Sequence, residues 1–116
     1  MGKLVAVGKA DEIAEGAMKE VTVEGRKVLL ARVGAQYYAV QNVCPHMGGT
    51  LSQGRLEGNV VTCPRHGSQF DLRDGSVVRW LGPSGLVSTL GKLLKSPKPL
   101  ATYNVRVEDG MVMVEA

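Results

Sequence analysis

Cys44-Pro45-His46 and Cys63-Pro64-Arg65-His66 are the two stretches that decide the fold of this chain. Together they contain both cysteines and both histidines of the 116 residues. Each stretch offers one thiolate and one imidazole on a short loop stiffened by proline. Thiolates and imidazoles together suit zinc or an iron–sulfur cluster. The pattern therefore predicts a metal site.

The spacing of the four residues distinguishes between these metals. Zinc fingers pair like ligands, as two cysteines followed by two histidines, because each pair must close on one ion. Here each loop carries one ligand of each kind, so the cysteines can bind one iron of a [2Fe–2S] centre and the histidines the other. Three alternatives stay open: structural zinc, a disulfide between Cys44 and Cys63 that leaves the histidines unexplained, or two core thiols beside unrelated surface imidazoles.

Beyond the four residues, the motif continues as Cys63-Pro-Arg-His66-Gly-Ser-Gln-Phe70-Asp71. The two-part pattern resembles the Rieske family, in particular its small soluble ferredoxins, over roughly residues 20–83 and 99–115. The resemblance implies one [2Fe–2S] cluster, with the buried iron on Cys44 and Cys63. It also implies that His46 and His66 bind the outer iron through Nδ1.

Three features beside the ligands predict a reduction potential in the lower half of the Rieske range, which spans about −150 to +300 mV. High-potential members carry a disulfide between the loops, at positions that are Gly49 and Arg65 here. Their tyrosine that donates to a cysteine sulfur is Phe70 here, which cannot donate. Ser68 matches their serine that donates to a bridging sulfide, so it is the one feature that raises the potential.

Short stretches of strand-forming residues between turn signals predict an all-β fold, a small antiparallel sandwich or barrel with both cluster-binding loops at one end. The expected strands are 3–7, 18–23, 26–32, 37–42, 60–63, 69–72, 102–108 and 111–115, with a turn or single helical turn at 11–15. Hairpins are expected around Glu24-Gly25 and Asp109-Gly110. We expect a single Rieske [2Fe–2S] domain over residues 1–116.

The stretch 84–98 is an insertion relative to the soluble ferredoxins of the family. Its leucines and valine recur with helical spacing, which predicts a short helix at about 84–95. The simpler interpretation packs its apolar face on the sandwich. The alternative is an exposed patch near the cluster that, with His46 and His66, forms a docking surface for a partner protein.

Composition narrows the partners and the compartment. Leu4–Val7 is too short for a signal peptide and no segment reaches transmembrane length, so we expect a cytoplasmic protein. Seven of the fourteen basic residues lie in 55–98 against three acidic ones, which predicts a positive cluster side and an acidic partner. Nucleic-acid binding is disfavoured, because there is no basic run and no recognised motif.

The resemblance implies a one-electron carrier with no catalytic site of its own. In the family such proteins pass electrons from a flavin-dependent reductase to a terminal oxygenase of the ring-hydroxylating dioxygenase type. A redox-responsive regulatory or accessory subunit of a larger oxidoreductase is the alternative function. A structural zinc module is the remaining one.

Overall fold

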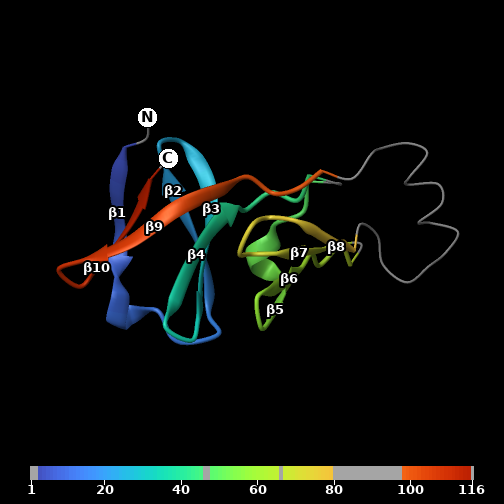
Figure 1. The fold of residues 1–116 in the computed structure, drawn as a ribbon. Helices are drawn as coiled ribbons and strands as arrows, with labels where there is room; N and C mark the ends of the chain where they lie inside the picture. The colour runs from blue at the N-terminus through green and yellow to red at the C-terminus, as the bar shows by residue number, and fades with distance from the viewer. Residues whose placement is uncertain (1–2, 46–47, 66, 80–97, 116) are drawn as a thin grey trace, which may run out of the picture.

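The computed structural model describes residues 3–45, 48–65, 67–79 and 98–115, and these residues form ten β-strands and two short 3-10 turns. A six-stranded antiparallel sheet has the order β1-β10-β9-β4-β3-β2, and a four-stranded sheet has the order β5-β6-β7-β8 (Figure 1). The strands are β1 (Leu4–Lys9), β2 (Met18–Val23), β3 (Arg26–Val33), β4 (Gln36–Gln41), β5 (Arg55–Glu57), β6 (Val60–Thr62), β7 (Gln69–Asp71), β8 (Val77–Arg79), β9 (Thr102–Glu108) and β10 (Met111–Glu115). The predicted all-β class is confirmed.

The larger sheet is built from hairpins whose turn residues set the register. Glu24 and Gly25 have φ of 50° and 78°, and Asp109 and Gly110 have 51° and 77°. Two successive left-handed residues twist a two-residue turn in the sense that its strands need, and glycine adopts that conformation at little cost. Both hairpins therefore lie where the sequence predicts them.

The larger sheet curls so that its inner face forms one apolar core. Val28 and Leu30 of β3 face Val112 and Val114 of β10 across this core, and all four are fully buried. The alternation of buried and less buried residues along β10 follows the period of two that places alternate side chains on opposite faces. An aliphatic, valine-rich interior is what the composition predicts.

A second core joins the two sheets and contains both cysteines. Leu29 and Val40 of the larger sheet pack there with Val61 and Phe70 of the smaller one. Cys44 and Cys63 belong to the same cluster. The smaller sheet extends to one side of the larger (Figure 1), and the core at their junction contains the two cysteines.

Two three-residue strands, β5 and β8, were not predicted. The 3-10 turn η1 (Ala10–Glu12) begins one residue before the polar turn predicted at 11–15 and overlaps it. The turn η2 (Leu51–Gln53) follows the first ligand loop. The helix expected at about 84–95 lies outside the described residues. Within the described part of the chain, no helix is long and apolar enough to cross a membrane.

Candidate metal centre

The first ligand loop is a closed hairpin tip between β4 and η2. An isolated bridge pairs Val43 with Thr50 at its base. The backbone N–H of Cys44 donates to the carbonyl of Gly49 at 2.7 Å, and the N–H of Gly48 donates to the carbonyl of Cys44 at 2.9 Å. These bonds fold six residues into a compact turn with the cysteine at its entry.

The second ligand loop repeats this construction between β6 and β7. Thr62 pairs with Gln69 at the base. The N–H of Cys63 donates to the carbonyl of Ser68 at 2.7 Å, and the N–H of Gly67 donates to the carbonyl of Cys63 at 3.2 Å. The two cysteines therefore occupy equivalent places in two loops of equal size, although the sequence in between differs.

A glycine four residues after each cysteine makes this turn accessible. Gly48 has φ of 75° and Gly67 has 78°. This left-handed conformation is costly for residues with a Cβ and routine for glycine. The placement explains why each ligand pair is followed by glycine in the sequence.

Both thiols are buried, and no disulfide joins them. Cys44 is 1% exposed and Cys63 is 3% exposed, and neither forms a disulfide. The disulfide alternative is therefore contradicted. Two thiols in one buried cluster, each at the entry of a closed loop, provide the soft half of a metal-ligand set.

The two loops also touch each other. A Cβ built on Gly49 would lie 2.8 Å from the Sγ of Cys63 and 2.9 Å from the Cγ of Arg65. The first loop thus approaches the second closely enough that only glycine leaves room for the thiol. It also places Gly49 against Arg65, the two positions at which the clamping disulfide of the high-potential proteins was inferred to be missing.

The structure describes three of the five predicted site residues. Cys44, Cys63 and Ser68 lie together at the junction of the sheets, and Ser68 is fully buried. His46 and His66 lie outside the described residues, so their placement stays a prediction. The described residues alone contain no group of three His, Cys, Asp or Glu side chains that could hold a metal ion.

Side chains outside the motif hold the loops in place, and the sequence reasoning missed them. Arg79 at the end of β8 donates from Nε to the carbonyl of Gly67 at 3.2 Å. Gln41 donates from Nε2 to the carbonyl of Val43 at 2.7 Å, and its Oε1 accepts from the N–H of Ala101 at 2.8 Å. Only their place next to a ligand loop or strand end could have drawn attention to them.

A fully buried asparagine is the other residue that sequence reasoning missed. Asn42 directly follows β4, the strand that leads to Cys44, and its side chain bonds to both Glu20 and Ser52. A polar residue at the end of an apolar strand was the available signal. Buried polar side chains are retained where they are fully hydrogen-bonded.

The surface around the second loop carries positive charge. A depression beside Cys63 is lined by Gln53, Gly54, Arg55, Thr62, Pro64 and Gly67. The Arg55 side chain is 76% exposed there, and its nearest carboxylate, on Glu57, is 3.9 Å away. Arg65 and Arg79 are exposed as well. An acidic surface would therefore meet little like charge here.

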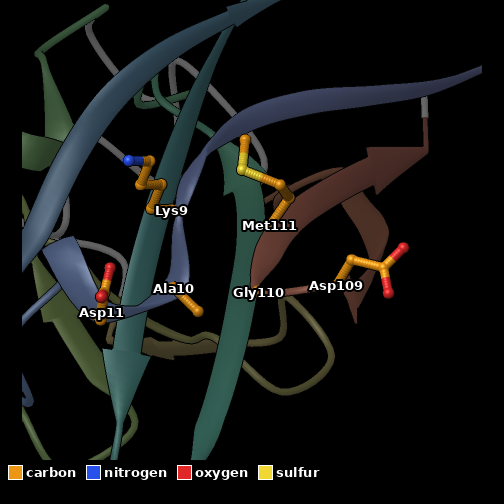
Figure 2. Close-up of a pocket in the computed structure, with 6 residues that line it drawn as sticks. All are labelled: Lys9, Ala10, Asp11, Asp109, Gly110 and Met111. Atoms are coloured by element: carbon orange, nitrogen blue, oxygen red, sulfur yellow. The ribbon is translucent and has the colours of Figure 1, made fainter.

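Another depression lies at the opposite end of the larger sheet and offers no comparable site. It is lined by Lys9, Ala10, Asp11, Asp109, Gly110 and Met111. Figure 2 shows the carboxylates of Asp11 and Asp109 on opposite sides of the place where Ala10 and Gly110 meet. The N–H of Ala10 donates to the carbonyl of Gly110 at 2.8 Å, so backbone atoms lie between the two carboxylates.

The fold and the paired cysteine loops define a class of iron–sulfur protein, and comparison with known families agrees. The chain matches the Rieske [2Fe-2S] domain over residues 3–103. It belongs to the Rieske family, as the motif predicts, and membership implies a [2Fe–2S] cluster.

Three relatives are similar over nearly the whole chain. The ferredoxin component of the naphthalene 1,2-dioxygenase system of Pseudomonas putida is 33% identical over 106 residues, which cover 90% of this chain and 86% of the relative. The ferredoxin of carbazole 1,9a-dioxygenase from Nocardioides aromaticivorans IC177 has a TM-score of 0.80 at 25% identity and covers 97% and 96%. A chain in the solved complex of reduced oxygenase and oxidized ferredoxin in carbazole 1,9a-dioxygenase has a TM-score of 0.78 at 30% identity and covers 97% and 92%.

Proposed function

We propose that this chain is a one-electron carrier of the Rieske ferredoxin type, formed by a single domain over residues 1–116. Its [2Fe–2S] cluster is held by Cys44, His46, Cys63 and His66. The observation that carries the proposal is the pair of buried thiols, not joined by a disulfide, on two equivalent loops that touch each other. When bound, the cluster supplies reversible one-electron chemistry.

The residues of the chain determine the environment of that cluster. Two thiolates neutralise part of the iron charge, and two neutral imidazoles leave the oxidised cluster without net charge, which favours accepting an electron. Phe70 and the surrounding aliphatic core exclude water from the cysteine side. Ser68 is buried, its carbonyl accepts from the N–H of Cys63, and its hydroxyl is the candidate donor to a bridging sulfide.

The partners we propose are a flavin-dependent reductase and a terminal oxygenase of the ring-hydroxylating type. Support comes from the relatives, which are named ferredoxin components of dioxygenase systems. A solved complex that contains an oxygenase with a ferredoxin adds to it. On this proposal the chain is an electron-transfer component and not an enzyme, and the lack of a disulfide between its two cysteines suits the reducing cytoplasm.

Spectroscopy of the anaerobically purified protein tests the cofactor. We expect a brown protein that gives a rhombic EPR signal with an average g value near 1.9 after reduction by dithionite, an expectation taken from the family resemblance. Cys63→Ser should abolish the colour, whereas Ser76→Ala, an exposed change in the β7–β8 turn, should keep it. A colourless wild-type protein that contains one zinc would overturn the proposal.

Stopped-flow electron transfer tests the carrier role. The reduced protein should be reoxidised rapidly by a ring-hydroxylating oxygenase and reduced again by its reductase. A protein that holds the cluster but exchanges electrons with neither, and binds a partner only in one redox state, would instead establish the regulatory alternative.

A further inference from the structure

Asn42 has a buried polar side chain and lies directly before the first ligand loop. It is fully buried, and every hydrogen-bonding group it has is used. Its Nδ2 donates to Oε2 of Glu20 at 2.7 Å and to Oγ of Ser52 at 3.0 Å, and its Oδ1 accepts from the N–H of Ser52 at 2.8 Å. A buried amide that makes all of its bonds holds its neighbours firmly, because losing one leaves a buried group unpaired.

The backbone of Asn42 completes the same junction. Its N–H donates to the carbonyl of Lys27 at 3.0 Å, and its carbonyl accepts from the N–H of Leu51 at 2.9 Å. Asn42 therefore connects β2 and β3 with η2, the turn that follows the first ligand loop. Both ends of that loop meet at this one residue.

The residues enclosed by this junction include two of the proposed ligands. Asn42 precedes Cys44 by two residues, and Ser52 follows Gly49 by three. From its position at the base of the loop, Asn42 determines how the entering and leaving chains sit relative to the larger sheet. No other described side chain bonds both to that sheet and to η2.

We infer that Asn42 is a positioning residue for the cluster: it fixes the first ligand loop on the larger sheet through Glu20 and Ser52, and so fixes the placement of Cys44 and His46. The inference rests on the proposed cluster. Asparagine suits the task because it donates two hydrogen bonds and accepts one through a short side chain. Leucine has nearly the same size and can make none of them.

Three variants of the holo-protein distinguish the hydrogen bond of Asn42 to Glu20 from its hydrogen bonds to Ser52. Asn42→Leu removes both. Asn42→Asp keeps the acceptor for the N–H of Ser52 but sets a carboxylate against that of Glu20. Adding Glu20→Gln to Asn42→Asp restores the pair with its polarity reversed, because the glutamine amide donates to the new carboxylate.

The measurement is the rate at which visible absorbance is lost in excess iron chelator, together with the EPR spectrum of the reduced protein. We expect loss about tenfold faster in Asn42→Leu, as removal of partners from a buried polar group predicts, and an altered rhombic signal. Asn42→Asp should fall between, and the double variant should return to within about twofold of wild type. Glu20→Gln should not improve Asn42→Leu.

Val112→Ala is the control for stability alone. Val112 is fully buried in the core of the larger sheet, on β10, and belongs to a cluster that contains neither cysteine. It should lower the free energy of unfolding but leave the EPR signal and the rate of cluster loss unchanged. Equal acceleration by Val112→Ala at matched stability would overturn the inference.

The remaining outcomes are also decisive. Wild-type kinetics in Asn42→Leu, or no improvement of Asn42→Asp by Glu20→Gln, would overturn the inference. If Asn42→Leu does not fold, the comparison of Asn42→Asp with its double variant decides alone. A wild-type protein without a cluster would overturn the proposed function. A wild-type protein that holds a cluster, but whose rate of cluster loss does not change when Asn42 is replaced, would overturn only the inference about Asn42.

Discussion

Beside the proposed cysteine ligands, Phe70 and Ser68 are the two buried side chains that we expect to affect the reduction potential most. Both are fully buried, and Phe70 packs in the same core as the two cysteines. We expect Phe70→Tyr to raise the potential, because a hydroxyl that donates to a cysteine sulfur stabilises the reduced cluster. Ser68→Ala should lower it. A hydrogen bond of about 1 kcal/mol corresponds to a shift on the order of 50 mV for one electron.

A redox titration of the purified protein measures these shifts. Phe70→Leu serves as the control, since it changes the packing without adding a donor, and it should shift the potential less than Phe70→Tyr. A lower potential in Phe70→Tyr would contradict the assignment of position 70. An unchanged potential in Ser68→Ala would show that the serine hydroxyl does not bond to the cluster.

At the scale of elements, the β7–β8 turn is connected to the chain that returns to β9. Gly75 has φ of 78°, its carbonyl accepts from the N–H of Leu100 at 2.8 Å, and a Cβ on it would lie 2.3 Å from the Leu100 carbonyl oxygen. Gly110 has φ of 77° with nothing within 4 Å of such a Cβ. Gly110→Ala should therefore cost about 1–2 kcal/mol, for the backbone conformation alone.

We expect Gly75→Ala to cost at least twice as much, because it also displaces Leu100, which is buried in the core that holds the cysteines. Urea unfolding of the two variants measures the difference in unfolding free energy. Equal losses in Gly75→Ala and Gly110→Ala would mean that the contact with Leu100 adds nothing to the backbone cost.

The same turn contains an ion pair that makes stability depend on pH. The Arg73 guanidinium donates to the Asp71 carboxylate, with an N–O distance of 2.7 Å, and this hydrogen bond lowers the pKa of Asp71 below its ordinary value of 3.8. A carboxyl whose pKa is depressed in the folded state stabilises the fold above the unfolded pKa. That contribution is lost as the pH falls through the folded pKa.

Arg73→Gln should therefore lower the unfolding free energy slightly at neutral pH, since the Arg73 side chain is 62% exposed and solvent weakens its attraction to Asp71. The difference from wild type should shrink as the pH falls below 3.8 and disappear below the lowered pKa. Denaturant unfolding in a series of acidic buffers measures it. With Asp71→Asn as the background, Arg73→Gln should have an effect that does not change with pH.

At the scale of the whole molecule, the net charge is +3, and the charged residues are unevenly distributed along the chain. The exposed arginines near the second loop face solvent beside the proposed cluster, whereas residues 99–116 carry one basic and three acidic side chains. Association with an acidic partner should slow as the salt concentration rises, because screening weakens long-range attraction.

Arg55→Gln tests this directly, because Arg55 lines the depression beside Cys63 and makes only a long contact with Glu57. We expect the second-order rate of electron transfer to the partner to fall about two- to fivefold at low salt, with a shallower dependence on salt. Arg106→Gln, on β9 with a side chain 63% exposed, should leave the rate unchanged. Equal effects of both variants would show that net charge alone matters.

The all-β class and the family could be predicted from the sequence alone, and the family implies a [2Fe–2S] cluster. Those conclusions depend on local patterns: one cysteine and one histidine in each loop, alternating apolar residues, and the turns at Glu24-Gly25 and Asp109-Gly110. Such patterns predict structure well, because the type of metal ligand and the twist of a hairpin turn depend on only a few neighbouring residues. The strands β9 and β10 occupy the predicted residues for this reason.

Only the tertiary structure decided how the loops are held. The bond from Arg79 to Gly67, the junction at Asn42 and the approach of Gly49 to Cys63 join residues that are 12, 22 and 14 positions apart. Sequence spacing contains no information about such contacts, since they depend on which strands the folded sheets bring together. The three-residue strands β5 and β8 were missed for the same reason: their pairing with β6 and β7 defines them, and their own residues do not.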